Sequence, residues 1–509
     1  LVFLSVFCYG YVINMKPQSI KFRMLEMVPG VLIWTTFVLS IVLSFFKPLW
    51  VIYFIIAFDL YWVFRVSHFI FFVNLAYFKF KKVQKTDWSK KVKEIDGWEK
   101  LYHIVYLPTA GEPVEVLRTT FNSLLESGYP TEKMMVVLGG EGRMEEDFTP
   151  KAAQIKKEFE SKFFKFLVTV HPGDLPAEMK GKGANANWMG HRSKEMVDEL
   201  GIVYEDLIVS YFDSDTCVHQ QYFWYLTYKY LTHPTPTKVL YQPAVVYNNN
   251  IWDAPAAMRV TAFGTIFWLL TELLRPERMY TFSSHSMSFK ALVDVGFWQK
   301  DIVTDDSRIF LQCFFRYNGN YAVEPMYIPV SMDTVMDKNY LQSFKNLYKQ
   351  QRRWAWGVEH FPYMMWEFRK NKLIPWWKKL KYTWNLTEGM YSWATAPILI
   401  FILGRLPLWV AGRGEDSSSV IVQNAPFVLE WLMAIAMSGI FVSAIISVLL
   451  LPPRPKTYSK WKYSIMLLQW IMLPITLVLF GSIPAIEAQT RLMLGSKFHL
   501  GFFVTPKSR

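Results

Sequence analysis

The apolar residues of the chain gather in long stretches near its two ends. Crossing the hydrocarbon core of a bilayer takes about 20 apolar residues. Residues 28–46 and 49–78 reach that length. Polar residues interrupt the second stretch at Asp59, Arg65 and His68. Three further stretches of this kind lie near the C-terminus, at about 391–410, 427–451 and 463–483. The pattern predicts transmembrane helices on both sides of a central region.

The central region, residues 100–348, has a different pattern. It contains no uninterrupted apolar stretch that we expect to span a membrane. Short apolar runs alternate with helix-like segments, which is typical of βα units on a mostly parallel, buried sheet. The runs cover residues 102–108, 134–140, 165–170 and 206–215. Because parallel sheets place their sites at the carboxyl ends of the strands, the polar residues after each run are candidates for function.

Basic and aromatic segments join these regions. Residues 79–93 carry seven lysines against one aspartate, which predicts a cytoplasmic position beside the bilayer. Residues 362–384 combine Trp with Lys and Arg, which predicts two interfacial helices broken at Pro375. The near-neutral loop 412–426 is expected outside, and the basic segment 452–463 in the cytoplasm.

The last apolar stretch leaves two topologies open. If residues 463–483 cross the bilayer, the basic tail lies outside, against the charge rule. Pro474 and Pro484 also allow a re-entrant or interfacial segment. We therefore divide the chain into an N-terminal segment (1–27), a transmembrane hairpin (28–78), a basic linker (79–99), an α/β domain (100–360), interfacial helices (361–390), a C-terminal transmembrane region (391–484) and a cytoplasmic-type tail (485–509).

Composition supports a membrane protein with a soluble part. Apolar residues make up 52% of the 509 residues and charged residues only 19%, against about 25% in an average soluble domain. The net charge is +13, and because much of the basic excess lies beside predicted spans, it indicates a bilayer rather than nucleic acid.

Cys8, Cys217 and Cys313 are far apart, which argues against a disulfide framework. The apolar start of the chain lacks signal-peptide features, and we expect it to be the remnant of an upstream helix.

Two acidic motifs are the first candidates for chemistry. Asp213 and Asp215 follow an apolar run and share one face in extended backbone, which suits a hard divalent cation or a simple turn. Thr304, Asp305 and Asp306 suit the start of a helix, and equally a general base in a partly dry cleft.

Three loops are candidates for binding an anionic ligand. The segment "KGKGANAN" (180–187) lacks Walker spacing, but its glycines permit close approach of phosphate, which Lys182 could neutralise. Glu112 follows the first run, as a helix cap or a ligand contact. Glu141 and Arg143 follow the second run and are expected to be exposed.

The segment "KQQRRWAWG" (349–357) combines amides, guanidiniums and indoles. As a helix it places Gln350, Arg353 and Trp354 on one face. Arginine binds pyrophosphate through two parallel hydrogen bonds, and an indole face suits the apolar face of a sugar ring. The alternative is a basic, aromatic helix on a membrane surface.

In this order, the motifs resemble the membrane-integrated family 2 glycosyltransferases, which include cellulose, hyaluronan and chitin synthases. That family carries D-x-D, T-E-D and Q-[QR]-x-R-W between transmembrane helices. The matching segments here are residues 213–215, 304–306 and 350–354, with Asp305 in place of Glu. The tail "FFVTPK" (502–507) is similar to the F-x-V-T-x-K gating loop of the family.

The resemblance implies a cytoplasmic GT-A domain and a role for each motif. Asp213 and Asp215 would hold Mg²⁺ or Mn²⁺, and Asp306 would be the general base. The donor nucleotide would contact Glu112, Glu141, Lys182, Asp213 and Arg353. The acceptor at the channel mouth would contact Gln350, Gln351, Trp354 and Asp305. The gating residues would be Phe502, Val504, Thr505 and Lys507.

We therefore expect an inverting hexosyltransferase that uses a UDP-sugar and builds and exports a polysaccharide, with an accessory export subunit as a possible partner. A single-addition transferase acting on a lipid-linked acceptor is the alternative. A transporter with a soluble regulatory domain is the non-enzyme alternative, and it leaves both acidic motifs without a role. The expected location is the plasma (inner) membrane.

Overall fold

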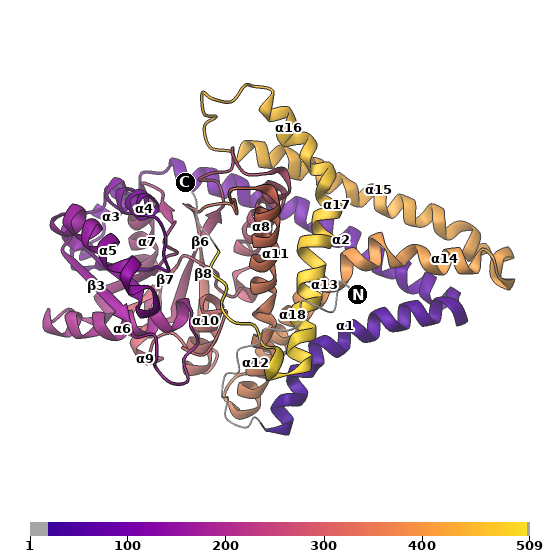
Figure 1. Cartoon of the computed structure of the whole chain (residues 1–509), viewed down its shortest axis with the longest axis horizontal. Helices are drawn as coiled ribbons and strands as arrows, with labels where there is room; N and C mark the ends of the chain where they lie inside the picture. Colours follow the sequence, from indigo (N-terminus) through magenta and orange to yellow (C-terminus); the bar gives the residue numbers. More distant parts are fainter. Residues whose placement is uncertain (1–18, 506–509) are drawn as a thin grey trace.

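The computed structural model describes residues 19–505, and Figure 1 shows an α/β domain at one end with long helices projecting from the other. Cys8, residues 1–18 of the predicted N-terminal segment, and Lys507 lie outside the described residues. The α/β domain is built on one eight-stranded sheet in the order β3-β2-β1-β4-β7-β6-β8-β5. The strands are β1 (Tyr102–Pro108), β2 (Met134–Glu141), β3 (Lys165–His171), β4 (Leu207–Tyr211), β5 (Cys217–Val218), β6 (Val239–Val246), β7 (His285–Ser288) and β8 (Ala322–Ser331).

The predicted mostly parallel sheet is confirmed. Strands β1, β2, β3 and β4 pair in parallel, and β6 pairs in parallel with β8, whereas β7 runs antiparallel between β4 and β6. All residues of β2 and β4 are buried, because helices cover both faces of the sheet. Such strands appear in a sequence as short continuous apolar runs, and the four predicted runs coincide with β1 to β4.

Ten helices belong to the α/β domain and its border with the membrane region, within the described residues. They are α3 (Trp88–Lys93), α4 (Val114–Glu126), α5 (Glu145–Phe159), α6 (Lys182–Glu199), α7 (Tyr222–Thr232), α8 (Ala256–Leu273), α9 (Phe289–Asp294), α10 (Asp305–Arg316), α11 (Tyr340–Ala355) and α12 (His360–Lys370). The membrane region contains α1 (Ile20–Phe46), α2 (Pro48–Lys85), α13 (Trp376–Phe401), α14 (Leu406–Ala411), α15 (Val420–Leu449), α16 (Lys462–Leu468), α17 (Leu473–Thr476) and α18 (Ile483–Leu494).

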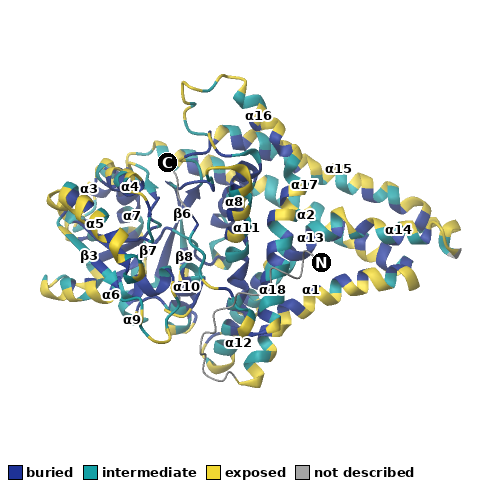
Figure 2. Cartoon of the chain, in the orientation of Figure 1, coloured by how far each residue is buried: buried dark blue, intermediate teal, exposed yellow. Residues whose placement is uncertain are grey.

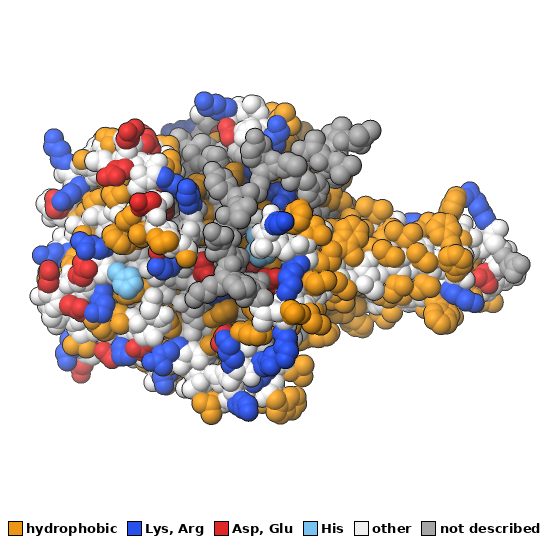
Figure 3. All heavy atoms as spheres, turned by 60° about the horizontal axis from the view of Figure 1, so that its bottom comes forward, with side chains coloured by type: hydrophobic (Ala, Val, Ile, Leu, Met, Phe, Trp, Pro, Cys, Tyr) orange, Lys and Arg blue, Asp and Glu red, His pale blue; other side chains and the backbone are white. Residues whose placement is uncertain are grey.

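The projecting helices have the length and apolar surface of membrane spans. Five helices of the described chain are long and apolar enough to cross a bilayer, or six if α13 and α14, bent by 48°, form one span. Apolar side chains cover the projection in Figure 3, and its outward faces are exposed in Figure 2. The protein is therefore a multi-pass membrane protein.

Helix α8 corrects the expectation that residues 100–348 contain no such stretch. It is 18 residues long and apolar enough to qualify, but 61% of it is buried, against 22% of the corresponding window of α2. Helix α8 packs on β6 on one side and on α2 on the other. Its apolar character therefore serves the junction between the sheet and the membrane helices.

The break predicted at Pro375 is present, since Pro375 directly precedes α13. A single helix, α13, then runs through the position where we placed the boundary between interfacial and transmembrane residues. Its first turns expose Trp376, Trp377 and Trp384 beside lysines, as expected for a helix that enters a bilayer through the headgroup layer.

Candidate active site

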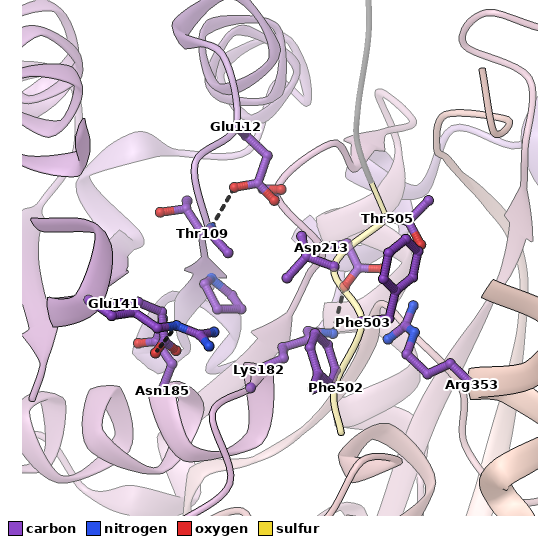
Figure 4. A pocket seen from close by; sticks show the side chains of 16 residues that line it. Thr109, Glu112, Glu141, Lys182, Asn185, Asp213, Arg353, Phe502, Phe503 and Thr505 are labelled. Carbon is purple, nitrogen blue, oxygen red and sulfur yellow. Dashed lines mark hydrogen bonds and ion pairs between the residues drawn. The ribbon is translucent and has the colours of Figure 1, made fainter. Parts of the chain in front are cut away.

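A cleft lies at the carboxyl ends of β1, β2 and β4, with about 560 Å³ of empty space that includes open solvent at its mouth. It is lined by Pro108, Thr109, Ala110, Glu112, Glu141, Arg143, Gly181, Lys182, Asn185, Asp213, Ser214, Arg353, Phe502, Phe503, Val504 and Thr505. Figure 4 shows the sheet-side residues opposite Arg353 and residues 502–505, which we call the cover segment. Residues that are more than 300 positions apart in the sequence therefore share this cleft.

Lys182 lies on the cleft wall and joins the two acidic motifs. It is the first residue of α6, and its Nζ lies 2.7 Å from Oδ1 of Asp213 and 3.0 Å from Oδ1 of Asp306. The ammonium also lies 4.0 Å from the ring centre of Tyr211. Burial alone would lower the pKa of Lys182. The nearby carboxylates of Asp213, Asp306 and Asp305 together have a larger, opposite effect, so the pKa lies above its ordinary value. Lys182 is thus a fixed cation.

Asp305 and Asp306, adjacent in the sequence, occupy different environments. Asp305 is buried, and its Oδ2 accepts a 2.6 Å hydrogen bond from the hydroxyl of Tyr211. Burial, with a contribution from the charge of Asp306, raises the pKa of Asp305 to about 7. The side chain of Asp306 keeps 23% of its surface exposed. Because Asp305 is enclosed, the geometry does not support our expectation that it contacts an acceptor.

The residues present fit a divalent cation held through Asp213. Asp213 lies on the cleft wall, where its Oδ2 accepts a 2.7 Å hydrogen bond from Ser283. Asp215 is fully buried, and its Oδ2 accepts the backbone N–H of Asp333 at 2.9 Å. Within residues 19–505, no group of three His, Cys, Asp or Glu side chains is arranged to hold a metal. The cation would therefore need oxygen ligands from a bound diphosphate or from water.

The acidic residues after the first two strands both line the cleft. Oε2 of Glu112 accepts the backbone N–H of Ala110 at 2.6 Å, so Glu112 closes the turn after β1. Glu141 is buried rather than exposed, which corrects our expectation, and its Oε2 lies 3.6 Å from both Arg143 Nε and His171 Nδ1. Burial lowers the pKa of His171, but the nearby carboxylate of Glu141 and the hydrogen bond to Glu178 raise it above its ordinary value.

Helix α11 carries the Q-Q-x-R-W motif along the other wall. Arg353 lines the cleft, and Trp354 lies 5.9 Å from Tyr247 between ring centres. Gln350 and Gln351 are both buried, so they are less accessible to an acceptor than we expected.

Two members of this segment that lacked a predicted role have structural partners. Arg352 Nη1 lies 2.6 Å from Oε1 of Glu487 on α18. Trp356 is buried and donates from Nε1 to Oε2 of Glu359 at 2.9 Å. The other oxygen of Glu359 accepts hydrogen bonds from the N–H and the hydroxyl of Thr304, at 3.1 and 2.6 Å. Glu359 therefore ties the Q-Q-x-R-W segment to the start of the T-D-D motif.

The cover segment reaches the cleft from the C-terminus. The guanidinium of Arg353 lies 4.8 Å from the ring centre of Phe502. A Cβ added at Gly181 would lie only 2.8 Å from Cβ of Phe502, so glycine is needed there for close approach of the two chains. Val504 and Thr505 also line the cleft.

Sequence reasoning missed several residues of this site. Tyr211 is the last residue of an apolar strand, and Tyr247, Ser283 and Glu359 belong to no motif that we singled out. Tyr211 was recognisable only as a polar tip at the end of a buried strand. The others come into contact with the motifs only through the tertiary fold.

Comparison with known proteins identifies the family. The profile described as "Glycosyl transferase family group 2" matches residues 208–483, more than half of the chain, whereas curated protein sequences give no match. Two solved structures are similar at low TM-scores. Mannosyltransferase PcManGT from Pyrobaculum calidifontis, in complex with GDP-Man and Mn²⁺, is 15% identical with a TM-score of 0.42, covering 77% of this chain and 99% of that one. S. aureus TarS 1-349, in complex with UDP-GlcNAc, is 12% identical with a TM-score of 0.37, covering 68% and 90%. The family assignment rests on the profile match: the chain belongs to glycosyl transferase family group 2, whose members are glycosyltransferases.

Proposed function

We propose that the protein is an inverting hexosyltransferase that moves a sugar from a UDP-sugar to the end of a growing polysaccharide, with its catalytic domain in the cytoplasm. The observation that carries this proposal is the position of Lys182. Its ammonium contacts one carboxylate from each acidic motif at the edge of a cleft that also contains Arg353. A cleft with two fixed cations suits a leaving diphosphate.

The donor would lie along the cleft with its diphosphate between Lys182 and Arg353. Lys182 is held by carboxylates and cannot turn away without losing two ion pairs. Asp213 would hold Mg²⁺ or Mn²⁺ together with the diphosphate. Asp215, which is buried and accepts the backbone N–H of Asp333, would support the backbone that carries Asp213. The bound cation would add positive charge beside the leaving group. Glu112 and Glu141 would contact the nucleoside end.

Transfer would take place in one displacement. The acceptor hydroxyl oxygen attacks the anomeric carbon, the bond from that carbon to the diphosphate oxygen breaks, and Asp306 takes the hydroxyl proton. Asp306 suits this role because it is the more exposed carboxylate of its motif. Asp305 is enclosed by Tyr211 and is poorly placed to act as a nucleophile, which favours inversion over a two-step mechanism.

The acceptor would meet Trp354 and the end of α11. The indole of Trp354 is partly exposed beside Tyr247, which gives an aromatic surface for a sugar ring. Export would follow through the membrane helices, in the plasma membrane and with an accessory subunit if one is required. Family membership argues against the transporter alternative.

The proposal is tested with the purified full-length protein, Mn²⁺ or Mg²⁺, and a panel of radiolabelled nucleotide sugars. Transfer from one donor to a product of polymer size supports the proposal. A product enlarged by a single sugar on a lipid acceptor would establish the single-addition alternative instead. Retention of the donor's anomeric configuration in the product would overturn the single-displacement mechanism.

The variant Asp306→Asn tests the catalytic assignment. Loss of a positioned base should lower kcat by about 10²–10⁴-fold, while the KM for the donor stays within about twofold. The matched control is Asp301→Asn, which changes an exposed carboxylate in the same loop and should behave like the wild type. Activity of Asp306→Asn near the wild-type level would refute the role of Asp306.

A further inference from the structure

Both ends of the described chain meet beside the candidate active site. Helix α1 and the residues after α18 lie outside the segment matched by the family profile. They contact each other, and the residues after α18 lead directly into the cover segment. Residues 495–500 therefore form the root of the cover segment.

Arg23 of α1 holds the end of α18, directly before this root. Its Nη1 donates to the carbonyl oxygen of Leu492 at 2.8 Å, and its Nη2 donates to the carbonyl oxygen of Met493. The same Nη1 lies 2.8 Å from Oε2 of Glu26, which is buried. The last carbonyl groups of a helix have no partner within the helix, so a guanidinium from another helix both satisfies and fixes them.

At the start of the root, the chain turns in contact with the guanidinium of Arg23. Gly495 has φ of +104°, a backbone conformation that favours glycine, and an added Cβ would lie 3.3 Å from Arg23 Cζ. The chain therefore turns at Gly495 directly against Arg23. A shift of this guanidinium would change the direction in which the root leaves α18.

His499 then brings the root to the catalytic motifs. Its imidazole packs edge-on against Trp356, 5.3 Å between ring centres, and its Nε2 lies 4.0 Å from Oε1 of Glu26. Trp356 is hydrogen-bonded to Glu359, which holds Thr304 of the T-D-D motif. Only Leu500 and Gly501 separate His499 from Phe502, so displacement of the root would move the cover segment.

We infer that Arg23 and Glu26 are positioning residues for the donor site: through the root, α1 holds the cover segment over the cleft, and donor affinity depends on this clamp. The inference rests on the proposed function, because it takes the ligand beneath the cover segment to be a nucleotide sugar. Arg23 and Glu26 do not line the cleft themselves, so they act through residues 495–505.

The test compares Arg23→Ala and Arg23→Lys in the full-length chain. Loss of charge-assisted hydrogen bonds to two carbonyl groups should raise the KM for the nucleotide sugar about tenfold, with kcat within about twofold. Lysine keeps the charge and should restore part of the lost affinity. Lys21→Ala, an exposed cation on the same helix, is the matched control and should leave KM unchanged.

Two further readouts separate positioning from general destabilisation. Trypsin should cut after the exposed Lys497 faster in Arg23→Ala than in the wild type. In chains truncated after Leu500, Arg23→Ala should cause no additional rise in KM, because the segment through which it acts is absent. An equal rise in KM with and without the cover segment would overturn the inference, as would an unchanged KM in the full-length variant.

The outcomes also separate this inference from the proposed function. If the wild type binds no nucleotide sugar, the proposed function fails, whereas faster cleavage after Lys497 in Arg23→Ala would still show that Arg23 holds the root. If Arg23→Ala cannot be purified, Glu26→Gln takes its place. It removes the carboxylate that orients Arg23 and should raise the KM about threefold, and an unchanged KM would then overturn the inference.

Discussion

Asp305 and Asp306 are adjacent on one helix, yet their carboxylates differ in exposure and in hydrogen-bond partners. Both carboxylates lie in the first turn of α10, where negative charge is favoured by the helix dipole. The turn directs Asp305 toward Tyr211 beneath the sheet edge and leaves Asp306 partly exposed beside Lys182. One carboxylate is thus enclosed, while its neighbour keeps part of its side chain accessible.

The buried carboxylate should make stability depend on pH. Burial raises the pKa of Asp305 from 3.8 to about 7, so between these values the folded chain binds a proton that the unfolded chain has lost. The contribution of this group to stability is complete below about pH 4 and is lost as the pH rises through about 7. Asp305→Asn stays neutral and still accepts the Tyr211 hydrogen bond, so it should avoid this loss.

The measurement is the Tm of the wild type and of Asp305→Asn in detergent at pH 5 and pH 8. At pH 8 the Tm of the variant should be higher, relative to that of the wild type, than it is at pH 5. Asp301→Asn, with its carboxylate exposed, should show no such change. If the Tm of Asp305→Asn differs from that of the wild type by the same amount at both pH values, the raised pKa of Asp305 is contradicted.

The sequence indicated the candidate residues that follow β1, β2 and β4, because the ends of parallel strands converge. The T-D-D and Q-Q-x-R-W motifs follow no strand directly, and residue type and the family resemblance indicated them. The sequence could not indicate which neighbour within a motif faces the cleft. Gln350 and Gln351 were expected to contact the acceptor because of the family resemblance, yet both are buried. Tyr211 was not singled out, since only the tertiary fold brings its hydroxyl to Asp305.

At the scale of elements, strands β1 to β4 were predicted, whereas β6, which is buried along its whole length, and the polar strand β7 were not. Strands β1, β2 and β4 appear as apolar runs because both faces are covered, whereas β3 is only partly buried. Strand β7 has the sequence His-Ser-Met-Ser, and its polar side chains find partners inside the sheet: Ser286 lies 2.8 Å from Ser210 and 3.0 Å from Tyr222, oxygen to oxygen. The hydrophobic pattern of the sequence does not predict such a strand. Helix α8 was missed for a related reason, since Arg259 and Glu272 interrupt its apolar sequence.

Helix α18 is joined to the α/β domain through one carboxylate. Glu487 accepts hydrogen bonds from Tyr348 and Arg352 of α11, both at 2.6 Å, and from Arg491 at 2.7 Å. Glu487→Ala would leave two guanidiniums close together without a counter-charge. We expect this to lower the free energy of unfolding by about 2 kcal/mol, because breaking a largely buried ion pair is costly.

The effect is measured as the thermal midpoint in detergent, with Glu430→Ala as a control that removes an exposed carboxylate from α15. The control should leave the midpoint unchanged. A midpoint for Glu487→Ala equal to that of the wild type would show that α11 and α18 are held together by their apolar contacts alone.

At the scale of the whole molecule, the question left open by the sequence is the course of residues 462–494. Figure 1 shows the helices from α16 to α18 running crosswise to α1 and α15, at the junction with the α/β domain. Near its start, this segment contacts the domain through Tyr463 and Trp252, 5.4 Å between ring centres, and through Gln469 and Arg259 at 2.6 Å. Its other end contacts the domain through Glu487 and Arg352.

A helix whose two ends both touch the same domain does not carry the chain across a bilayer. Leu468, Ile471, Ile475 and Leu479 are exposed along it, as expected for a stripe that faces lipid while the opposite face packs on the protein. We therefore predict that residues 456–460 and the root of the cover segment lie on the same side of the membrane, although this segment is long and apolar enough to span one. This arrangement also places the basic tail with the basic linker 79–93, in agreement with the charge rule.

Single cysteines at Lys456 and Ser496, in a background with the natural cysteines replaced by serine, test this topology in sealed, oriented vesicles. An impermeant maleimide should label both positions from the side that exposes the α/β domain. A third cysteine at Ser417, in the loop between α14 and α15, should be labelled only from the opposite side, because an odd number of spans separates that loop from the domain. Labelling of Lys456→Cys and Ser496→Cys from opposite sides would show that residues 462–494 cross the bilayer. The cover segment would then be cut off from the cleft, because it would lie on the opposite side of the membrane from the α/β domain.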